Sequence, residues 1–186
     1  MSIFGKAAAT ALTSVSLLAS LAAPALAASN HQDHVQLAHT ISTFGVDLFV
    51  NPDYCHQQAD GGKFYGFYAG ARRVMVICPE NAGIGEEDVE WTEEDYDTLR
   101  HEAQHLIQDC IDGKLDAELV PFLDDPVEHA RAVLGTNALG SIMRTYAESG
   151  ADYDTVVLEF EAFAIAEQNL PLAQAEVIQE VCPVFN

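Results

Sequence analysis

The stretch RHEAQHLIQDC holds two histidines four residues apart, His101 and His105, and a glutamate, Glu102, directly follows the first. On a helix, residues four apart stack one turn above each other, so both imidazoles can reach one tetrahedral zinc ion. Glu102 is rotated away from the pair to a place beside the metal, where its carboxylate can take a proton from zinc-bound water. The pattern predicts a zinc site that activates water for hydrolysis.

A solvated helix face that carries both histidines by accident is the alternative. In a chain of this composition, chance gives H-E-x-x-H in roughly 2% of cases by multiplication of residue frequencies. The helix pattern places both histidines on the side opposite its core-facing stripe. That stripe consists of Leu99, Ala103, Leu106, Ile107 and Cys110.

A hydrolytic zinc site needs a third protein ligand and keeps a fourth position for water. We predict that Glu159 is this ligand, because it lies amid the apolar face of a later helix, where an uncompensated carboxylate is costly. The alternatives for Glu159 are a partly exposed helix residue or a salt bridge to Arg131 or Arg144. The neighbouring Glu161 falls on the polar face of that helix and is expected to be solvated.

Candidates closer to the motif fit less well. Asp109 and Asp112 follow the histidines too closely to complete a tetrahedron from the opposite side. His129 would require H-E-x-x-H-x-x-G-x-x-H, and Gln108 stands where that pattern has glycine. A group near the N-terminus is either a second metal site or a mobile polar terminus. It comprises His31, Asp33, His34 and His39.

Capping and stop signals indicate the helix around the motif and the helices after it. Thr92 with three acidic residues behind it predicts an N-cap, and Asp112-Gly113 ends that helix near Ile111. A second helix should run from Asp125-Pro126 to near Gly150, with disturbances at Gly135 and Gly140. Two more should begin near Asp154 and at Pro171.

The segment KFYGFYAGARRVMVIC, before the motif, predicts a hairpin with its turn at residues 69–71. The expected fold class is therefore α+β: a short, hairpin-based antiparallel sheet packed on the histidine helix, followed by two or three further helices.

Residues 1–27 have the features of a secretory signal peptide: one lysine, an apolar Ala/Leu-rich run, and small residues before cleavage after Ala27. An uncleaved membrane anchor is the alternative. Residues 28–186 should form a single domain. The net charge of −21 argues against nucleic acid and anionic membranes as partners.

Four cysteines in an exported chain predict two disulfides. The sequence allows three pairings. We favour Cys55–Cys78 and Cys110–Cys182, because each joins the ends of segments that are expected to pack together. A four-cysteine zinc site is the alternative, although no C-x-x-C pair is present.

His101-Glu102-x-x-His105 and the later Glu159-Phe160-Glu161-Ala162 resemble the gluzincin metallopeptidases, particularly minimal exported bacterial forms. The hairpin GFYAGARRVMVICPEN resembles the strand pair that precedes their histidine helix, and the resemblance covers roughly residues 63–168. It implies a zincin-like domain in which His101, His105 and Glu159 bind zinc and Glu102 is the general base. It also implies that Arg73–Ile77 is an edge strand that pairs with an extended substrate.

The chain departs from this family at Phe163, where many gluzincins have an aspartate that orients a histidine. Asp109 is a candidate substitute for that aspartate. Tyr146 and Tyr153 are candidates for stabilising the developing oxyanion, with ordinary helix packing as the alternative for both.

We therefore expect a secreted or periplasmic, monomeric zinc endopeptidase acting on peptide or protein substrates. One alternative is a non-catalytic exported binding protein that keeps the scaffold with a structural or degenerate metal site. Another is a disulfide-stabilised helical domain without metal, in which His101 and His105 face bulk water with no carboxylate near.

Overall fold

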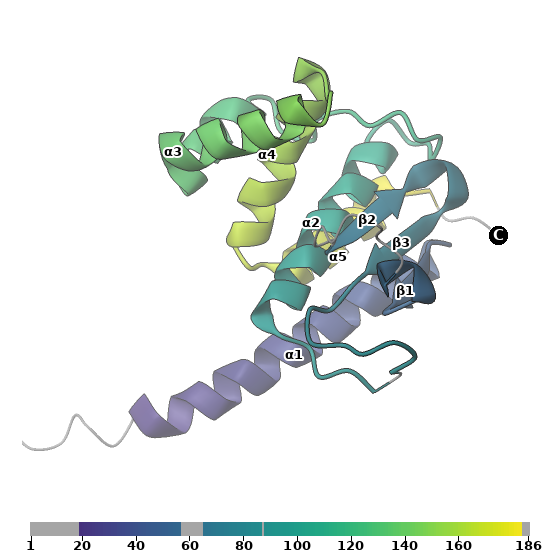
Figure 1. The fold of residues 1–186 in the computed structure, drawn as a ribbon, viewed down its shortest axis with the longest axis vertical. Coiled ribbons are helices and arrows are strands. Elements are labelled where there is room, and N and C mark those ends of the chain that lie inside the picture. The colour runs from purple at the N-terminus through teal and green to yellow at the C-terminus, as the bar shows by residue number, and fades with distance from the viewer. Residues whose placement is uncertain (1–18, 57–64, 87, 184–186) are drawn as a thin grey trace, which may run out of the picture. The chain divides into compact units, whose positions relative to one another are not determined.

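The computed structural model describes residues 19–56, 65–86 and 88–183 (Figure 1). The chain divides into two compact units, residues 1–32 and 33–186, and helix α1 (Ala19–Thr43) continues across the boundary. Most of the predicted signal peptide lies outside the described residues, and its predicted cleavage point after Ala27 falls within α1. None of the described helices is both long and apolar enough to span a membrane.

A three-stranded sheet in the second unit has the order β1-β3-β2. Strands β2 (Gly66–Ala69) and β3 (Val74–Ile77) pair antiparallel, which confirms the predicted hairpin. Strand β1 (Asp47–Val50) pairs with β3 in parallel, so the sheet is mixed and the purely antiparallel sheet was a wrong prediction. A four-residue strand that pairs across a long sequence separation leaves no local pattern that reveals its partner.

The position of β3 corrects a second prediction. Because β3 lies between β1 and β2, residues 73–77 do not form the edge of the sheet. The edges are β1 and β2, and β2 contacts the histidine helix. A hairpin pattern identifies two neighbouring strands, but it does not say which of them gains a third neighbour.

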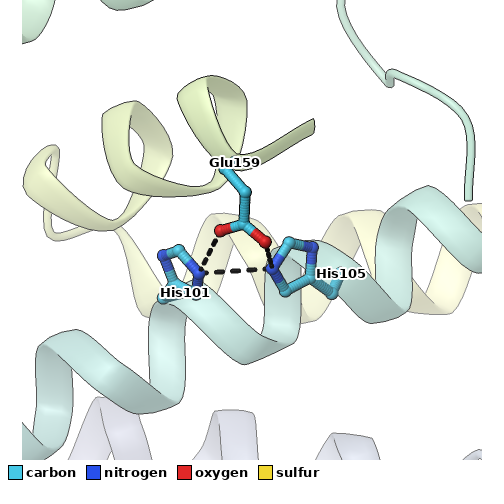
Figure 2. A group of neighbouring side chains, drawn as sticks. All are labelled: His101, His105 and Glu159. Carbon is cyan, nitrogen blue, oxygen red and sulfur yellow. Dashed lines mark hydrogen bonds and ion pairs between the residues drawn. The ribbon is translucent and has the colours of Figure 1, made fainter. Parts of the chain in front are cut away.

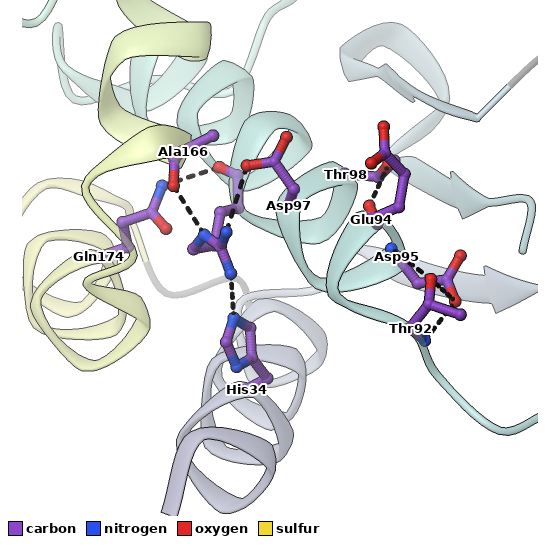
Figure 3. Close-up of polar contacts among 9 residues, drawn as sticks. His34, Thr92, Glu94, Asp95, Asp97, Thr98, Ala166 and Gln174 are labelled. Atoms are coloured by element: carbon purple, nitrogen blue, oxygen red, sulfur yellow. Dashed lines mark hydrogen bonds and ion pairs between the residues drawn. The ribbon is translucent and has the colours of Figure 1, made fainter. Parts of the chain in front are cut away.

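The histidine helix, α2 (Glu93–Cys110), begins and ends as its sequence predicts. Thr92 and Asp95 form a capping box: Thr92 Oγ1 accepts from the Asp95 N–H at 3.3 Å, and the Thr92 N–H donates to Asp95 Oδ2 at 2.7 Å (Figure 3). At the other end, Gly113 adopts a positive φ of 80°, which glycine tolerates without strain.

Three further helices follow, in agreement with the prediction. They are α3 (Pro126–Glu148), α4 (Tyr153–Glu167) and α5 (Pro171–Val181). The disturbance in α3 is confined to Gly135, with φ 79° and ψ 160°, and Gly140 continues the helix. Helices α3 and α4 pack together, and α2 contacts α4 on one side and α5 on another (Figure 1). The described chain is therefore an α+β protein.

Two apolar clusters flank the position where α2 meets α4. The larger cluster joins α1, the sheet, α2 and α5, and it includes the whole predicted apolar stripe of α2. The smaller cluster lies between α3 and α4 and includes Val156, Phe160 and Ala164. Helix α4 is thus committed to α3 on one face and to α2 on another, which leaves it little solvent-facing surface.

Disulfides and a buried arginine fasten these elements. Cys55–Cys78 and Cys110–Cys182 are both formed, as predicted, and the second joins the ends of α2 and α5. Arg100 on α2 contacts His34 Nε2 through Nη1 at 2.6 Å and donates through Nε to the Ala166 carbonyl at 2.8 Å. Gln174 donates to the Arg100 carbonyl at 2.8 Å, and His34, Ala166 and Gln174 surround this point (Figure 3). His34 thus helps to hold α1.

Candidate metal centre

His101, His105 and Glu159 meet where α4 crosses α2 (Figure 2). The Nε2 atoms of the histidines lie 3.2 Å apart, and they lie 3.1 Å and 3.4 Å from Glu159 Oε2 and Oε1 respectively. Among the described residues, this is the single group of three or more that could hold a metal ion. The structure brings together the three residues that the sequence predicted as ligands.

The spacing of the two imidazole nitrogens fits a small tetrahedral cation. Ligand atoms held about 2.0–2.2 Å from a tetrahedral zinc are separated from one another by about 3.3–3.6 Å. The two Nε2 atoms, 3.2 Å apart, lie close to that range, and each lies near a different oxygen of the Glu159 carboxylate. Two imidazole nitrogens and a carboxylate that converge in this way need a proton or a cation between them.

The two helices produce this convergence through their packing. His101 and His105 occupy positions one turn apart on α2, on the side opposite the apolar stripe. Helix α4 covers that side, so each histidine is only 8% exposed. Ala162 on α4 is fully buried, and its small side chain permits close approach of the two helices. This contradicts the alternative in which the histidines face bulk water.

The charges within the cluster stabilise one another. Burial alone would raise the pKa of Glu159, but hydrogen bonds and charge from the two histidines hold it well below its usual range. Burial alone would lower the pKa of His105, but hydrogen bonding and charge from Glu159 raise it to about 9. Glu159 therefore stays ionised, as a metal ligand must be.

Glu102 lies beside the cluster and is almost completely buried. Burial raises its pKa, while the neighbouring His101 and His105 and a backbone hydrogen bond from Tyr68 act in the opposite direction. A Cβ on Gly66 would lie 3.6 Å from Glu102 Cγ, so the backbone of β2 runs directly against this side chain. A carboxylate with a raised pKa at this position suits proton transfer.

A pocket of about 450 Å³ opens beside Glu102. Strand β2, helix α2 and residues of α3 and α4 form its walls. Its lining residues are Tyr65, Gly66, Glu94, Asp97, Thr98, His101, Glu102, Thr145, Tyr146 and Phe163. The general-base candidate and one ligand candidate therefore face a space that a substrate can enter.

The two predicted tyrosines differ in their positions. Tyr146 lines the pocket, and burial together with the charges of Glu159 and Glu102 raises the pKa of its phenol, which therefore stays a neutral donor. Tyr153 is 61% exposed in the first turn of α4 and is not among the residues that line the pocket. The structure thus brings Tyr146 to the site and leaves Tyr153 outside it.

Phe163 stands where many gluzincins, the family that the sequence resembles, have an aspartate. Its ring lies against His101, with the ring centroids 4.4 Å apart. Nδ1 of His101 is buried and has no hydrogen-bond partner among the described residues. His101 is therefore held by packing and by Glu159, without a polar partner on its second nitrogen.

His105 has the partner that His101 lacks, and it is a residue that the sequence analysis did not assign. Gln108 Oε1 lies 2.8 Å from His105 Nδ1. Asp109, the predicted substitute, instead accepts hydrogen bonds from the Tyr68 hydroxyl at 2.7 Å and from the N–H groups of Asp116 and Ala117. That prediction was wrong. The spacing of Gln108, three residues after His105, was the available signal.

Glu161 also contradicts its prediction. It is completely buried, with four hydrogen-bond donors around its carboxylate, and is not solvated. The helical pattern predicted one solvent-exposed face on α4, whereas α2 and the segment before α3 cover that face.

Two residues that the sequence analysis considered less suitable as ligands lie elsewhere. His129 contacts Gln168, and Asp112 pairs with Lys114.

Comparison of the chain with protein-family models, with curated proteins and with solved structures gave no match.

Proposed function

We propose that this protein is a zincin-like, zinc-dependent peptidase that acts in an oxidising, extracytoplasmic compartment. The observation that supports this most is the convergence of two imidazole nitrogens and the Glu159 carboxylate within 4.8 Å of one another, with Glu102 and a pocket directly beside them. The two disulfides and the predicted signal peptide favour a secreted or periplasmic location.

The residues of the site suit hydrolysis of a peptide bond. Zinc held by His101, His105 and Glu159 would polarise the substrate carbonyl and lower the pKa of the attacking water. Glu102 would accept the proton of that water and pass it to the leaving amine. The neutral phenol of Tyr146 would donate a hydrogen bond to the oxyanion.

Strand β2 is the better candidate for holding an extended substrate, in place of the strand predicted from sequence. It is an edge strand, and two adjoining residues, Tyr65 and Gly66, line the pocket. Main-chain groups at the edge of a sheet can hydrogen-bond to a peptide of any sequence. The pocket side chains would then select among substrates.

The proposal is tested by measuring zinc content and peptidase activity together. We expect the wild-type protein to bind about one zinc per chain, as a site with three protein ligands does. Glu102→Gln should keep the zinc and lose hydrolysis of a generic fluorogenic peptide mixture or of casein. A wild-type protein that binds no zinc would contradict the proposal, and so would full activity in Glu102→Gln.

A non-catalytic exported binding protein with a structural metal is the second candidate. The unpartnered Nδ1 of His101 favours it, because the ligands of active zinc sites are usually oriented by a second hydrogen bond. The two functions differ at the fourth coordination position. Water exchange at that position, measured by relaxation of the Mn²⁺- or Co²⁺-substituted protein, indicates the enzyme, and a closed position indicates the binding protein.

A further inference from the structure

A carboxylate with no exposed surface lies behind the candidate metal centre. Glu161 Oε1 accepts hydrogen bonds from Gln104 Nε2 at 2.7 Å, Gln108 Nε2 at 3.1 Å and the Phe122 N–H at 3.1 Å. Its Oε2 accepts from the Leu123 N–H at 2.9 Å. A buried carboxylate is costly unless it is well hydrogen-bonded, so these donors are needed to keep it in place.

This carboxylate determines which way the Gln108 amide points. Gln108 Nε2 donates to Glu161 Oε1 at 3.1 Å and to the Leu158 carbonyl at 3.0 Å, and a carbonyl oxygen can only accept. Since these two bonds use both amide hydrogens, Oε1 of Gln108 must be the atom that faces His105. The amide therefore cannot flip without the loss of two hydrogen bonds, one buried and one partly buried.

The Gln108 amide in turn determines the state of His105. An amide oxygen only accepts, so His105 Nδ1, at 2.8 Å, must carry the hydrogen. In the neutral ring, the lone pair is then on Nε2, which is the atom that faces His101 and Glu159. The hydrogen-bond acceptor at Glu161 thus fixes the orientation of the Gln108 amide, and this amide fixes the lone pair of His105 on Nε2.

We propose that Gln108 and Glu161 are positioning residues of the metal centre, which fix the tautomer and ring orientation of His105. This inference rests on the proposed zinc site. In many histidine sites a carboxylate bonds directly to the second ring nitrogen of the ligand. Here the Gln108 amide, which lies on the same helix as His105, makes that bond, and the buried Glu161 carboxylate orients the amide. Neither residue touches the pocket.

Gln104 provides a matched control for Gln108. Both glutamines lie on α2, both are almost completely buried, and both donate to the same oxygen of Glu161. Of these two side chains, Gln108 is the one that hydrogen-bonds a histidine of the cluster. If the network serves stability alone, removal of either amide should have the same effect on zinc affinity.

The test is the Zn²⁺ dissociation constant of the full chain, measured by competition with a chromophoric chelator. Gln108→Met should weaken binding by about 10- to 100-fold, the usual effect of removing an outer hydrogen bond from a ligand. Gln104→Met should bind zinc as the wild type does, although both variants unfold at lower temperature. The visible spectrum of the Co²⁺-loaded protein should change in Gln108→Met and not in Gln104→Met.

Nitrogen-15 NMR of the zinc-loaded wild-type protein keeps the test decisive if Gln108→Met does not fold. The ring of His105 should carry its hydrogen on Nδ1, the atom that faces Gln108 Oε1. A hydrogen on Nε2 instead would overturn the positioning role.

The outcomes separate this inference from the proposed function. Equal zinc affinity in Gln108→Met and Gln104→Met overturns the positioning role and leaves the zinc site in place. A zinc-loaded wild-type protein whose His105 carries its hydrogen on Nε2 also overturns the positioning role. A wild-type protein without zinc overturns both proposals.

Discussion

The two histidines of the cluster have similar burial and lie one turn apart, yet their second nitrogens have opposite surroundings. Nδ1 of His105 faces the amide of Gln108, which Glu161 holds in place. Nδ1 of His101 has no hydrogen-bond partner in the described structure, and the ring of Phe163 lies against this histidine. The His105 side is a closed polar network, whereas the His101 side borders the pocket.

This difference indicates that the two histidines can serve different purposes, one requiring fixed geometry and the other requiring freedom to adjust. A closed network fixes geometry, because each member would lose a buried hydrogen bond by moving. A ligand held mainly by packing can adjust its ring when a substrate enters the pocket. In the proposed metal centre, the His105 side would set the position of the metal and the His101 side would accommodate the substrate.

Removal of Glu159 should have the largest effect, since it is the one predicted ligand that comes from α4 and serves both sides. Glu159→Ala should weaken Zn²⁺ binding by more than about 100-fold, beyond the effect of outer-sphere changes. The exposed Glu167 on the same helix is the matched control, and Glu167→Ala should bind zinc normally. Equal affinity of the two variants, measured by chelator competition, would contradict the assigned ligand set.

The pH dependence of zinc binding should come next in size. In the metal-free protein Glu159 raises the pKa of His105 to about 9, so this imidazole is protonated at neutral pH and zinc must displace the proton. The logarithm of the association constant should rise by about one unit per pH unit between pH 7 and 9, then level off. Calorimetry in two buffers of different ionisation enthalpy should show the released proton. Binding that is independent of pH across this range would contradict the assignment.

A change on the pocket side should affect stability and activity together. A Cβ at Gly66 would lie 2.6 Å from the Val76 carbonyl and 2.8 Å from Thr98 Cγ2, so β2 must move away from α2. We expect Gly66→Ala to lower the free energy of unfolding by about 1–3 kcal/mol, as overpacking does. Peptide hydrolysis should fall as well, whereas zinc affinity should change little.

Gly140 is the control for this substitution. It lies within α3 and a Cβ there would meet nothing within 4 Å. Gly140→Ala should therefore raise the free energy of unfolding by about 0.5–1 kcal/mol. If chemical denaturation shows that both alanines are tolerated equally, the close contact between β2 and α2 is not as described.

The smallest effect should come from making the His101 side resemble the His105 side. Phe163→Asp places a carboxylate on the residue that packs against His101, and Phe163→Ala removes the ring without adding one. The aspartate variant should bind Zn²⁺ up to about tenfold more tightly than the alanine variant. If the alanine variant binds as tightly or more tightly, the unpartnered Nδ1 is not what limits affinity.

Local signals in the sequence were sufficient for much of this arrangement. The capping box at Thr92, the positive-φ glycine after α2 and the four-residue histidine spacing act within one or two turns of helix. Glu159 was predictable because a carboxylate amid apolar residues requires a compensating partner. The disulfide pairs followed from which segments were expected to pack together.

The errors concern contacts that no local pattern encodes. Glu161 lies on the polar face of α4 by periodicity, but α2 and residues 122–123 cover that face. Gln108 gains its role only because Leu158 and Glu161 orient its amide. Strand β1 was missed because its partner lies more than twenty residues away in the sequence.

The long connection between α2 and α3, residues 111–125, has its backbone held by side chains on both sides. Asp109 accepts from the N–H groups of Asp116 and Ala117, and Glu161 accepts from those of Phe122 and Leu123. A protease must bind its substrate as an extended strand, and this connection would first have to give up those partly buried hydrogen bonds. The proposed peptidase would thereby be protected from cutting itself at this connection, a kind of segment that is usually vulnerable to proteolysis.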